Sequence, residues 1–134
     1  MFRPGDCFQI VSGVYEDGRP KRHPFVVVTD FDKETGDAIM VSFSSTNGKP
    51  HIDKTTVIPA GSHDFITEES YAAYYLAARM THNDLDDKVN RGFAIQGKPI
   101  SERLLFKLRA GIMASKDTPP SIKIFYQECL YRRL

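Results

Sequence analysis

The segment 25–29 limits the fold of this chain more than any other stretch. It reads Phe-Val-Val-Val-Thr and stands between Pro24 and Asp30. A short β-branched run that is apolar on both faces is typical of a strand in the middle of a sheet. After a turn-rich link, segment 38–44 alternates apolar and polar side chains, which predicts a second strand. We expect the two strands to form a hairpin.

Weaker patterns extend this strand-rich half of the chain. Segments 6–11 and 55–59 predict short strands, and segment 13–23 predicts a polar loop. Segment 70–80 alternates as a strand does, but its tyrosines also recur at helical spacing and its alanines favour a helix. Local pattern therefore leaves both structures open for 70–80. Segment 83–92 is polar and carries helix-stop and turn signals, so we expect a turn there.

The last third of the chain predicts two helices. In segment 100–114, Ser101 can cap the helix, and Leu104, Leu108 and Ile112 lie on one apolar stripe. After two consecutive prolines, segment 122–130 repeats apolar residues at helical spacing. Strands first and helices later indicate the α+β class, with a small curved sheet or barrel covered by a helix. We find no linker and expect one domain over residues 1–134.

Composition narrows the possible functions. The 134 residues are 41% hydrophobic and 26% charged, which excludes an intrinsically disordered chain. The net charge is only +1, so any site for a polyanion must be a local basic patch. No apolar run is long enough for a membrane-spanning helix and the first residues lack a signal peptide, so we expect a cytoplasmic protein without a membrane partner.

The cysteines and histidines do not form a metal-ligand pattern. Cys7 and Cys129 are far apart in the sequence, and no CxxC pair or ligand-spaced histidines occur. We therefore expect two reduced thiols, no metal site and no cofactor. The glycine-rich loops that bind nucleotide phosphates are also missing from the sequence.

A basic cluster just before the first central strand is the strongest chemical signal. Cleaving RNA without a metal requires a base, an acid and a cation that stabilises the phosphorane. His23 could transfer protons, and Arg22 could bind the phosphate. Ser44 and Ser45, at the end of the next strand, could donate hydrogen bonds to the same phosphate. A solvated basic loop with no catalytic role would have the same composition, so spacing alone does not decide between the two.

Two other groups have a functional and a structural interpretation. His63 followed by Asp64 could be a general base with its orienting carboxylate, or a polar turn. Tyr71, Tyr74 and Tyr75 could stack on bases, but tyrosines at this spacing also occur in cores and dimer contacts.

Four short motifs, in order along the chain, resemble the PemK/MazF-like toxin family of toxin–antitoxin systems. They are Arg-Pro-Gly-Asp at 3–6, Arg-His-Pro at 22–24 leading into the apolar strand, Val-Ser-Phe-Ser-Ser at 41–45, and Gly97 followed by Ile-Ser at 100–101 with its leucine stripe. The resemblance covers about residues 3 to 114. It implies a small SH3-like β-barrel with one or two C-terminal helices, and it makes segment 70–80 a strand.

The resemblance also implies a function. The family's usual activity is metal-independent cleavage of single-stranded RNA by a homodimer, with the RNA across the dimer groove and an antitoxin protein as inhibitor. On this basis the catalytic residues would be Arg22, His23, Ser44 and Ser45, and the RNA-binding residues would be Arg19, Lys21 and Lys49. The family usually has an arginine directly before the proline, where this chain has His23. That difference favours an alternative, a catalytically inactive barrel that binds a protein or nucleic-acid partner. A small molecule beneath the tyrosines is a third possibility.

Overall fold

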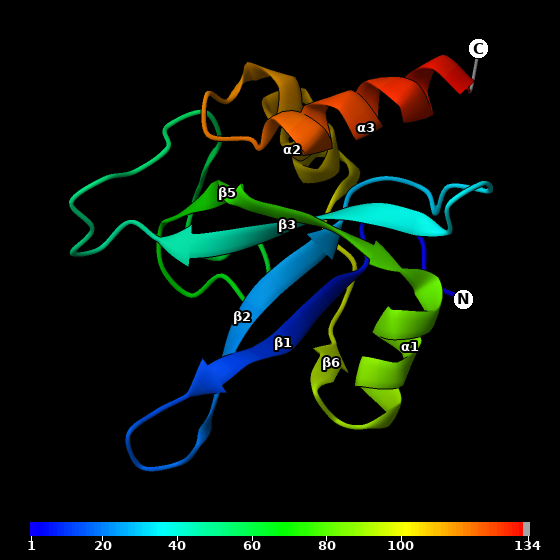
Figure 1. The fold of residues 1–134 in the computed structure, drawn as a ribbon. Helices are drawn as coiled ribbons and strands as arrows, with labels where there is room; N and C mark the ends of the chain where they lie inside the picture. The colour runs from blue at the N-terminus through cyan, green and yellow to red at the C-terminus, as the bar shows by residue number, and fades with distance from the viewer. Residues whose placement is uncertain (133–134) are drawn as a thin grey trace.

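The apolar run 25–29 lies at the centre of an antiparallel sheet in the computed structural model, which describes residues 1–132 (Figure 1). Val26, Val27 and Val28 are fully buried, because both faces of the sheet are covered here. The first three residues of the run end strand β2 (Pro20–Val27), which pairs with β1 (Cys7–Val14) and β3 (Asp37–Ser45). The predicted central hairpin is therefore confirmed.

The described residues form one sheet of six strands. The other strands are β4 (Val57–Ile58), β5 (Ser70–Thr81) and β6 (Ala94–Gln96). The strand order is β4-β5-β3-β2-β1-β6, so β4 and β6 are the edges and the sheet is not closed. Segment 70–80 is a strand, as the family resemblance implies. Its alanines do not make a helix because Ala72 and Ala73 are fully buried in the sheet beside β3.

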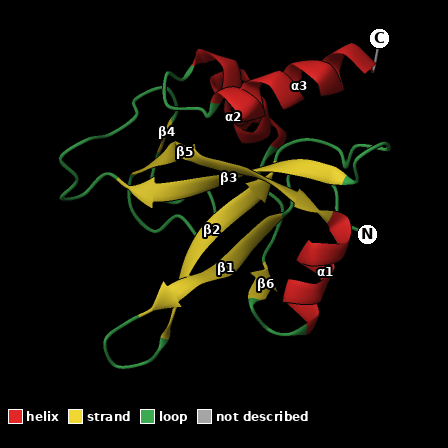
Figure 2. Cartoon of the chain, viewed as in Figure 1, coloured by secondary structure: helices red, strands yellow, loops and turns green. Residues whose placement is uncertain are grey.

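Three helices complete the α+β fold, and Figure 2 shows them on two sides of the sheet. Helices α2 (Glu102–Ala114) and α3 (Pro120–Arg132) lie together over one face, whereas α1 (His82–Asn90) lies beside β6. The predicted cap of α2 is confirmed, because the Ser101 hydroxyl accepts a hydrogen bond from the Leu104 amide. Within the described residues, no helix combines the length and apolar character needed to cross a membrane.

Each face of the sheet has its own apolar core. The core under α2 and α3 includes Val26, Val41 and Leu108, and the core on the α1 side includes Val27 and Leu85. Successive strand residues point to opposite faces, so a run of valines supplies both cores. This is the physical reason why segment 25–29 is apolar without alternation.

Two sequence predictions are corrected by the structure, and one strand was not predicted. The loop expected at 13–23 is shorter, because β1 continues to Val14 and β2 begins at Pro20. The turn expected at 83–92 is helix α1, which Thr81 caps and which buries only Leu85. Strand β6 was not expected at all, and its three residues pair with β1. A short polar helix and a three-residue strand depend on tertiary contacts that local patterns do not contain.

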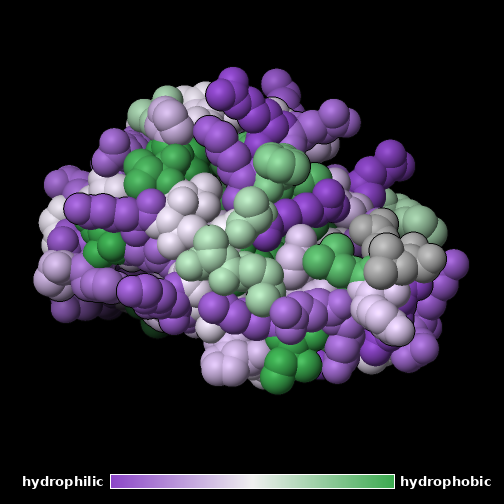
Figure 3. Space-filling model, turned by 90° about the horizontal axis from the view of Figure 1, so that it is seen from above, coloured by the Kyte–Doolittle hydropathy of each residue, from purple (hydrophilic) through white to green (hydrophobic). Residues whose placement is uncertain are grey.

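Figure 3 looks onto the side of the molecule that carries α2 and α3. Hydrophobic residues there form separate patches between hydrophilic ones. Exposed apolar side chains include Phe106 on α2 and Ile124 on α3. On this side, the described residues therefore present no single broad apolar surface.

The two cysteines are free thiols, as predicted, and they should differ sharply in reactivity. Cys7 is 0% exposed, and burial raises the pKa of its thiol to about 12. Cys129 is only half-buried. Because the thiolate is the reactive form, we expect a disulfide reagent to modify Cys129 in the folded protein and Cys7 only after unfolding. Mass spectrometry of a Cys129→Ser variant checks this, and rapid labelling of Cys7 in that folded variant would contradict it.

Candidate functional site

The hairpin of β1 and β2 extends away from α2 and α3 and carries the predicted catalytic pair (Figure 1). His23 lies opposite Ile10, and Arg22 lies opposite Val11. One step further the register shifts, so that Lys21 lies opposite Gly13 and Ser12 is an extra residue in β1. An extra residue of this kind is a β-bulge, which bends the strand and turns a side chain to a new direction.

The hydroxyl of this extra residue, Ser12, lies against the His23 ring. Ser12 Oγ lies 2.5 Å from Nδ1 of His23. Burial lowers the pKa of His23 below its usual range, and the positive charges of Lys21 and Lys49 lower it further. The imidazole is therefore mostly neutral at pH 7 and able to accept a proton. Sequence reasoning did not find Ser12, because its role depends on the register between two strands.

Arg22 and His23 do not share a face. Both lie in β2 and not in a loop, so strand alternation directs their side chains to opposite sides of the sheet. The Arg22 side chain has a buried Nε without a hydrogen-bond partner in the described part of the chain. The structure therefore separates the pair that the sequence placed together, and a catalytic role for Arg22 stays a prediction.

The two serines of β3 are divided in the same way. The last pair between β2 and β3 is Phe25 with Ser42. His23 and Ser44 are each two residues beyond that pair, so both are on the Phe25–Ser42 face. Ser45 belongs to the other face, and its hydroxyl accepts a hydrogen bond from the Asn47 amide. The site face thus contains His23 and Ser44, whereas the opposite face contains Arg22 and Ser45.

Ser44 has a tyrosine as its neighbour on β5. It lies directly opposite Tyr71 in the register of β3 and β5. Burial raises the pKa of the Tyr71 hydroxyl, and a hydrogen bond with Ser44 works against that rise. Tyr74 points into the core instead, where its hydroxyl lies 2.8 Å from Thr56 Oγ1 and donates to the Leu108 carbonyl at 2.9 Å. Tyr74 is therefore a core residue, whereas Tyr75 is 55% exposed.

The predicted RNA-binding cations lie in different surroundings. Arg19 forms an exposed ion pair with Asp17 at 2.6 Å and lies over the Tyr15 ring. Lys21 also lies near that ring, with its Nζ 5.9 Å from the centroid. Lys49 belongs to the exposed loop after β3, and its charge reaches His23. Lys21 and Lys49 are thus the two cations that act electrostatically on the imidazole.

His63 is a structural link and not a general base. Its Nδ1 accepts a hydrogen bond from the Phe65 amide, and its Nε2 lies 2.5 Å from the Lys98 carbonyl. Both ring nitrogens are therefore occupied by the backbone. The same contact region explains Gly97, because a Cβ there would lie 2.5 Å from the Phe65 ring.

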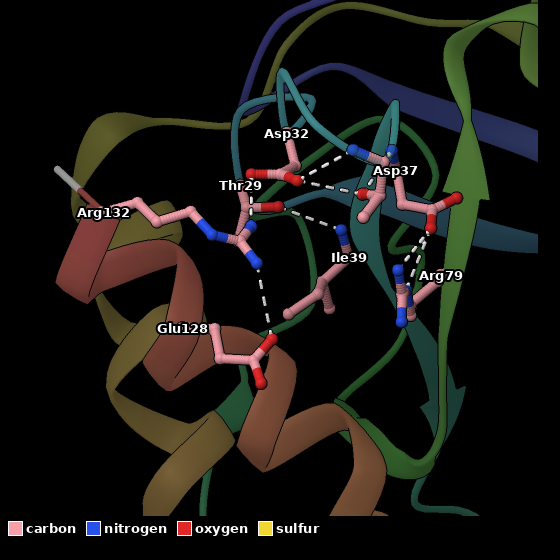
Figure 4. Close-up of polar contacts among 8 residues, drawn as sticks. Thr29, Asp32, Asp37, Ile39, Arg79, Glu128 and Arg132 are labelled. Carbon is pink, nitrogen blue, oxygen red and sulfur yellow. Dashed lines mark hydrogen bonds and ion pairs between the residues drawn. The ribbon is translucent and has the colours of Figure 1, made fainter.

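A separate cleft of about 1110 Å³ lies between the N-terminus, the β2–β3 connection and α3. Its lining includes Phe2, His82, Asp32, Arg109, Cys129 and Arg132. Figure 4 shows Arg132 pointing from α3 toward Asp32, at 2.7 Å, with Glu128 on the same helix beside it. Arg132 thus attaches α3 to the β2–β3 connection through Asp32, and also through Glu34 at 3.5 Å. The cleft shares no lining residue with the cluster of Ser12, Lys21, His23 and Lys49.

Comparison with known proteins leaves the family open. The sequence matches no protein family model, and no curated protein is significantly similar to it.

Proposed function

We propose that this protein is a metal-independent endoribonuclease that cleaves single-stranded RNA. The proposal includes an SH3-like barrel of the PemK/MazF type, a homodimer and an antitoxin partner, all of which depend on the motif resemblance. The observation that carries the activity is the His23 cluster, in which a neutral imidazole lies against a hydroxyl and is influenced by the charges of two lysines, Lys21 and Lys49. A neutral histidine beside fixed positive charge suits proton abstraction next to a phosphate.

The chemistry follows from these groups. The neutral imidazole of His23 takes the proton of a 2′-hydroxyl, and the 2′-oxygen attacks the adjacent phosphorus. The bond from phosphorus to the 5′-oxygen then breaks, and this oxygen takes a proton from water. Lys21 and Lys49 stabilise the negative charge of the phosphorane, and Ser44 donates a hydrogen bond to a non-bridging oxygen. The products are a 2′,3′-cyclic phosphate and a 5′-hydroxyl.

The charge of the chain supports a single-stranded substrate held locally. A net charge of +1 lacks the overall basic excess that duplex-binding proteins usually carry. Lys21 and the exposed Tyr15 lie together at the hairpin tip, where a base could stack while its phosphate meets a cation. Arg19 is the weaker candidate, because Asp17 already neutralises it.

A second candidate is a catalytically inactive barrel that binds a protein or nucleic acid. Strand alternation favours it, because the Arg22 side chain points away from His23 and cannot join it on one phosphate. An inactive module would bind RNA or a partner and leave the RNA chain intact.

Incubation with a labelled single-stranded RNA in excess chelator separates the two functions. We expect new RNA fragments, and no cleavage of a DNA strand of the same sequence, because DNA lacks the 2′-hydroxyl. Binding of the RNA without fragments would support the inactive module. Cleavage of RNA and DNA alike would overturn the proposed chemistry.

A further inference from the structure

We propose that Ser12 is a positioning residue that holds His23 in the tautomer protonated at Nδ1, so that Nε2 is the nitrogen that accepts the substrate proton. The catalytic consequence rests on the proposed ribonuclease function. The tautomer itself does not, and it can be measured without a substrate.

The pairing of β1 with β2 gives Ser12 this position. His23 lies opposite Ile10, whose side chain belongs to the core on the α1 side. Ser12 follows two residues later, on the same side of β1, and it is the extra residue where the register shifts. Its hydroxyl reaches the imidazole edge, 2.5 Å from Nδ1.

The two contacts of the Ser12 hydroxyl support this tautomer. The Ser12 hydroxyl lies 2.5 Å from the His23 Nδ1 and also 3.4 Å from the Lys21 carbonyl oxygen. A carbonyl oxygen can only accept, and a hydroxyl has one proton to donate. When Ser12 donates to Lys21, its oxygen accepts from Nδ1, so Nδ1 is protonated and Nε2 has the lone pair. Nε2 of His23 makes no hydrogen bond to any described residue.

Burial, and then the surrounding charges, lower the pKa of His23 and keep its ring neutral. Lys21 on the same strand and Lys49 on the loop after β3 both act against the imidazolium form. Ser12 on β1 is uncharged and forms a bond only at Nδ1. In this cluster the ring is neutral, Nδ1 is hydrogen-bonded to Ser12, and Nε2 is available to a substrate. A histidine that acts as a general base requires these three properties.

Long-range ¹H–¹⁵N NMR of the full chain at neutral pH tests the tautomer directly. Two other histidines serve as internal references. His63 accepts at Nδ1 from Phe65, so its proton is on Nε2, and His82 accepts at Nε2 from the Phe2 amide. We expect His23 to give the Nδ1–H pattern of His82, and Ser12→Ala to shift it toward the pattern of His63. An Nε2–H pattern in the unsubstituted protein, or no change in Ser12→Ala, would overturn the proposal.

Kinetics test the consequence, with Ser12→Thr as the matched control that retains the hydroxyl. We expect Ser12→Ala to lower kcat on the order of 10-fold with KM unchanged, because the ring loses its orientation while the phosphate-binding cations remain. Ser12→Thr should keep most of the activity. Equal kcat in Ser12→Ala and the unsubstituted protein would refute the positioning role. If the unsubstituted protein cleaves no RNA, the proposed function fails and the NMR result alone decides the tautomer.

Discussion

Replacing His23 with alanine is expected to lower the rate constant of RNA cleavage by about 10²–10⁴-fold, the usual contribution of a positioned general base. The imidazole is the group in the cluster that can accept a proton at neutral pH, because Lys21 and Lys49 are cations and Ser12 is a hydroxyl. The side chain is only half-buried, so the fold should survive its loss. Single-turnover cleavage in chelator, with thermal unfolding of the same sample, measures both effects.

Two other substitutions serve as controls for this result. His51→Ala removes another imidazole, which is 79% exposed and paired with Asp117, and should change the rate less than about twofold. Arg22→Gln tests whether Arg22 is catalytic, as the sequence predicts, or lies on the face of the sheet away from His23, as strand alternation indicates. A small effect agrees with strand alternation, whereas a loss as large as that of His23→Ala would mean that Arg22 reaches the scissile phosphate. Full activity in His23→Ala would show that His23 is not the general base.

Gly111→Ala is expected to destabilise the fold, although glycine to alanine normally strengthens a helix by about 1 kcal/mol. Gly111 faces β5 from the last third of α2, and a Cβ there would lie 1.8 Å from the Tyr74 hydroxyl. The same Cβ would lie 2.7 Å from Thr56 Oγ1. The tyrosine must move, which breaks its hydrogen bonds to Thr56 and the Leu108 carbonyl. Overpacking of this kind costs about 1–3 kcal/mol, and each lost hydrogen bond about 1 kcal/mol more.

Urea unfolding of Gly111→Ala measures this cost. The matched control is Ala110→Gly, one residue earlier on the exposed side of α2, which should lose only about 1 kcal/mol from helix propensity. A Gly111→Ala variant as stable as the unsubstituted protein would show that α2 does not pack on Tyr74 as described.

Local sequence patterns predicted the elements whose stability is mainly local or strongly apolar. The β-branched run at 25–29 and the alternation at 38–44 correspond to the centre of the sheet. The Ser101 cap and the leucine stripe correspond to α2. Helix α1 was not predicted because it buries one residue, Leu85, among polar ones. A single apolar residue does not form the repeating stripe by which a helix is recognised in a sequence.

The candidate site was only partly predictable, and the reason is register. Because Arg22 is adjacent to His23, and Ser44 to Ser45, the sequence suggested that each pair acts at one site. In a strand, however, adjacent side chains point to opposite faces. Ser12 reaches His23 through the pairing of β1 with β2, where Ile10 lies opposite His23, and no local pattern in either strand indicates that register. The contact of His63 with the Lys98 carbonyl is likewise long-range, so its structural role could not be inferred from the dipeptide with Asp64.

The most direct test of the central claim is the chemistry of the RNA ends after incubation with the purified protein in chelator. If His23 activates a 2′-hydroxyl, the fragments carry a 2′,3′-cyclic phosphate and a 5′-hydroxyl, and a single 2′-deoxy substitution at the cleaved position abolishes that cut. Fragments that carry a 5′-phosphate, or cutting that persists at the 2′-deoxy position, would contradict a reaction begun by proton transfer to this histidine.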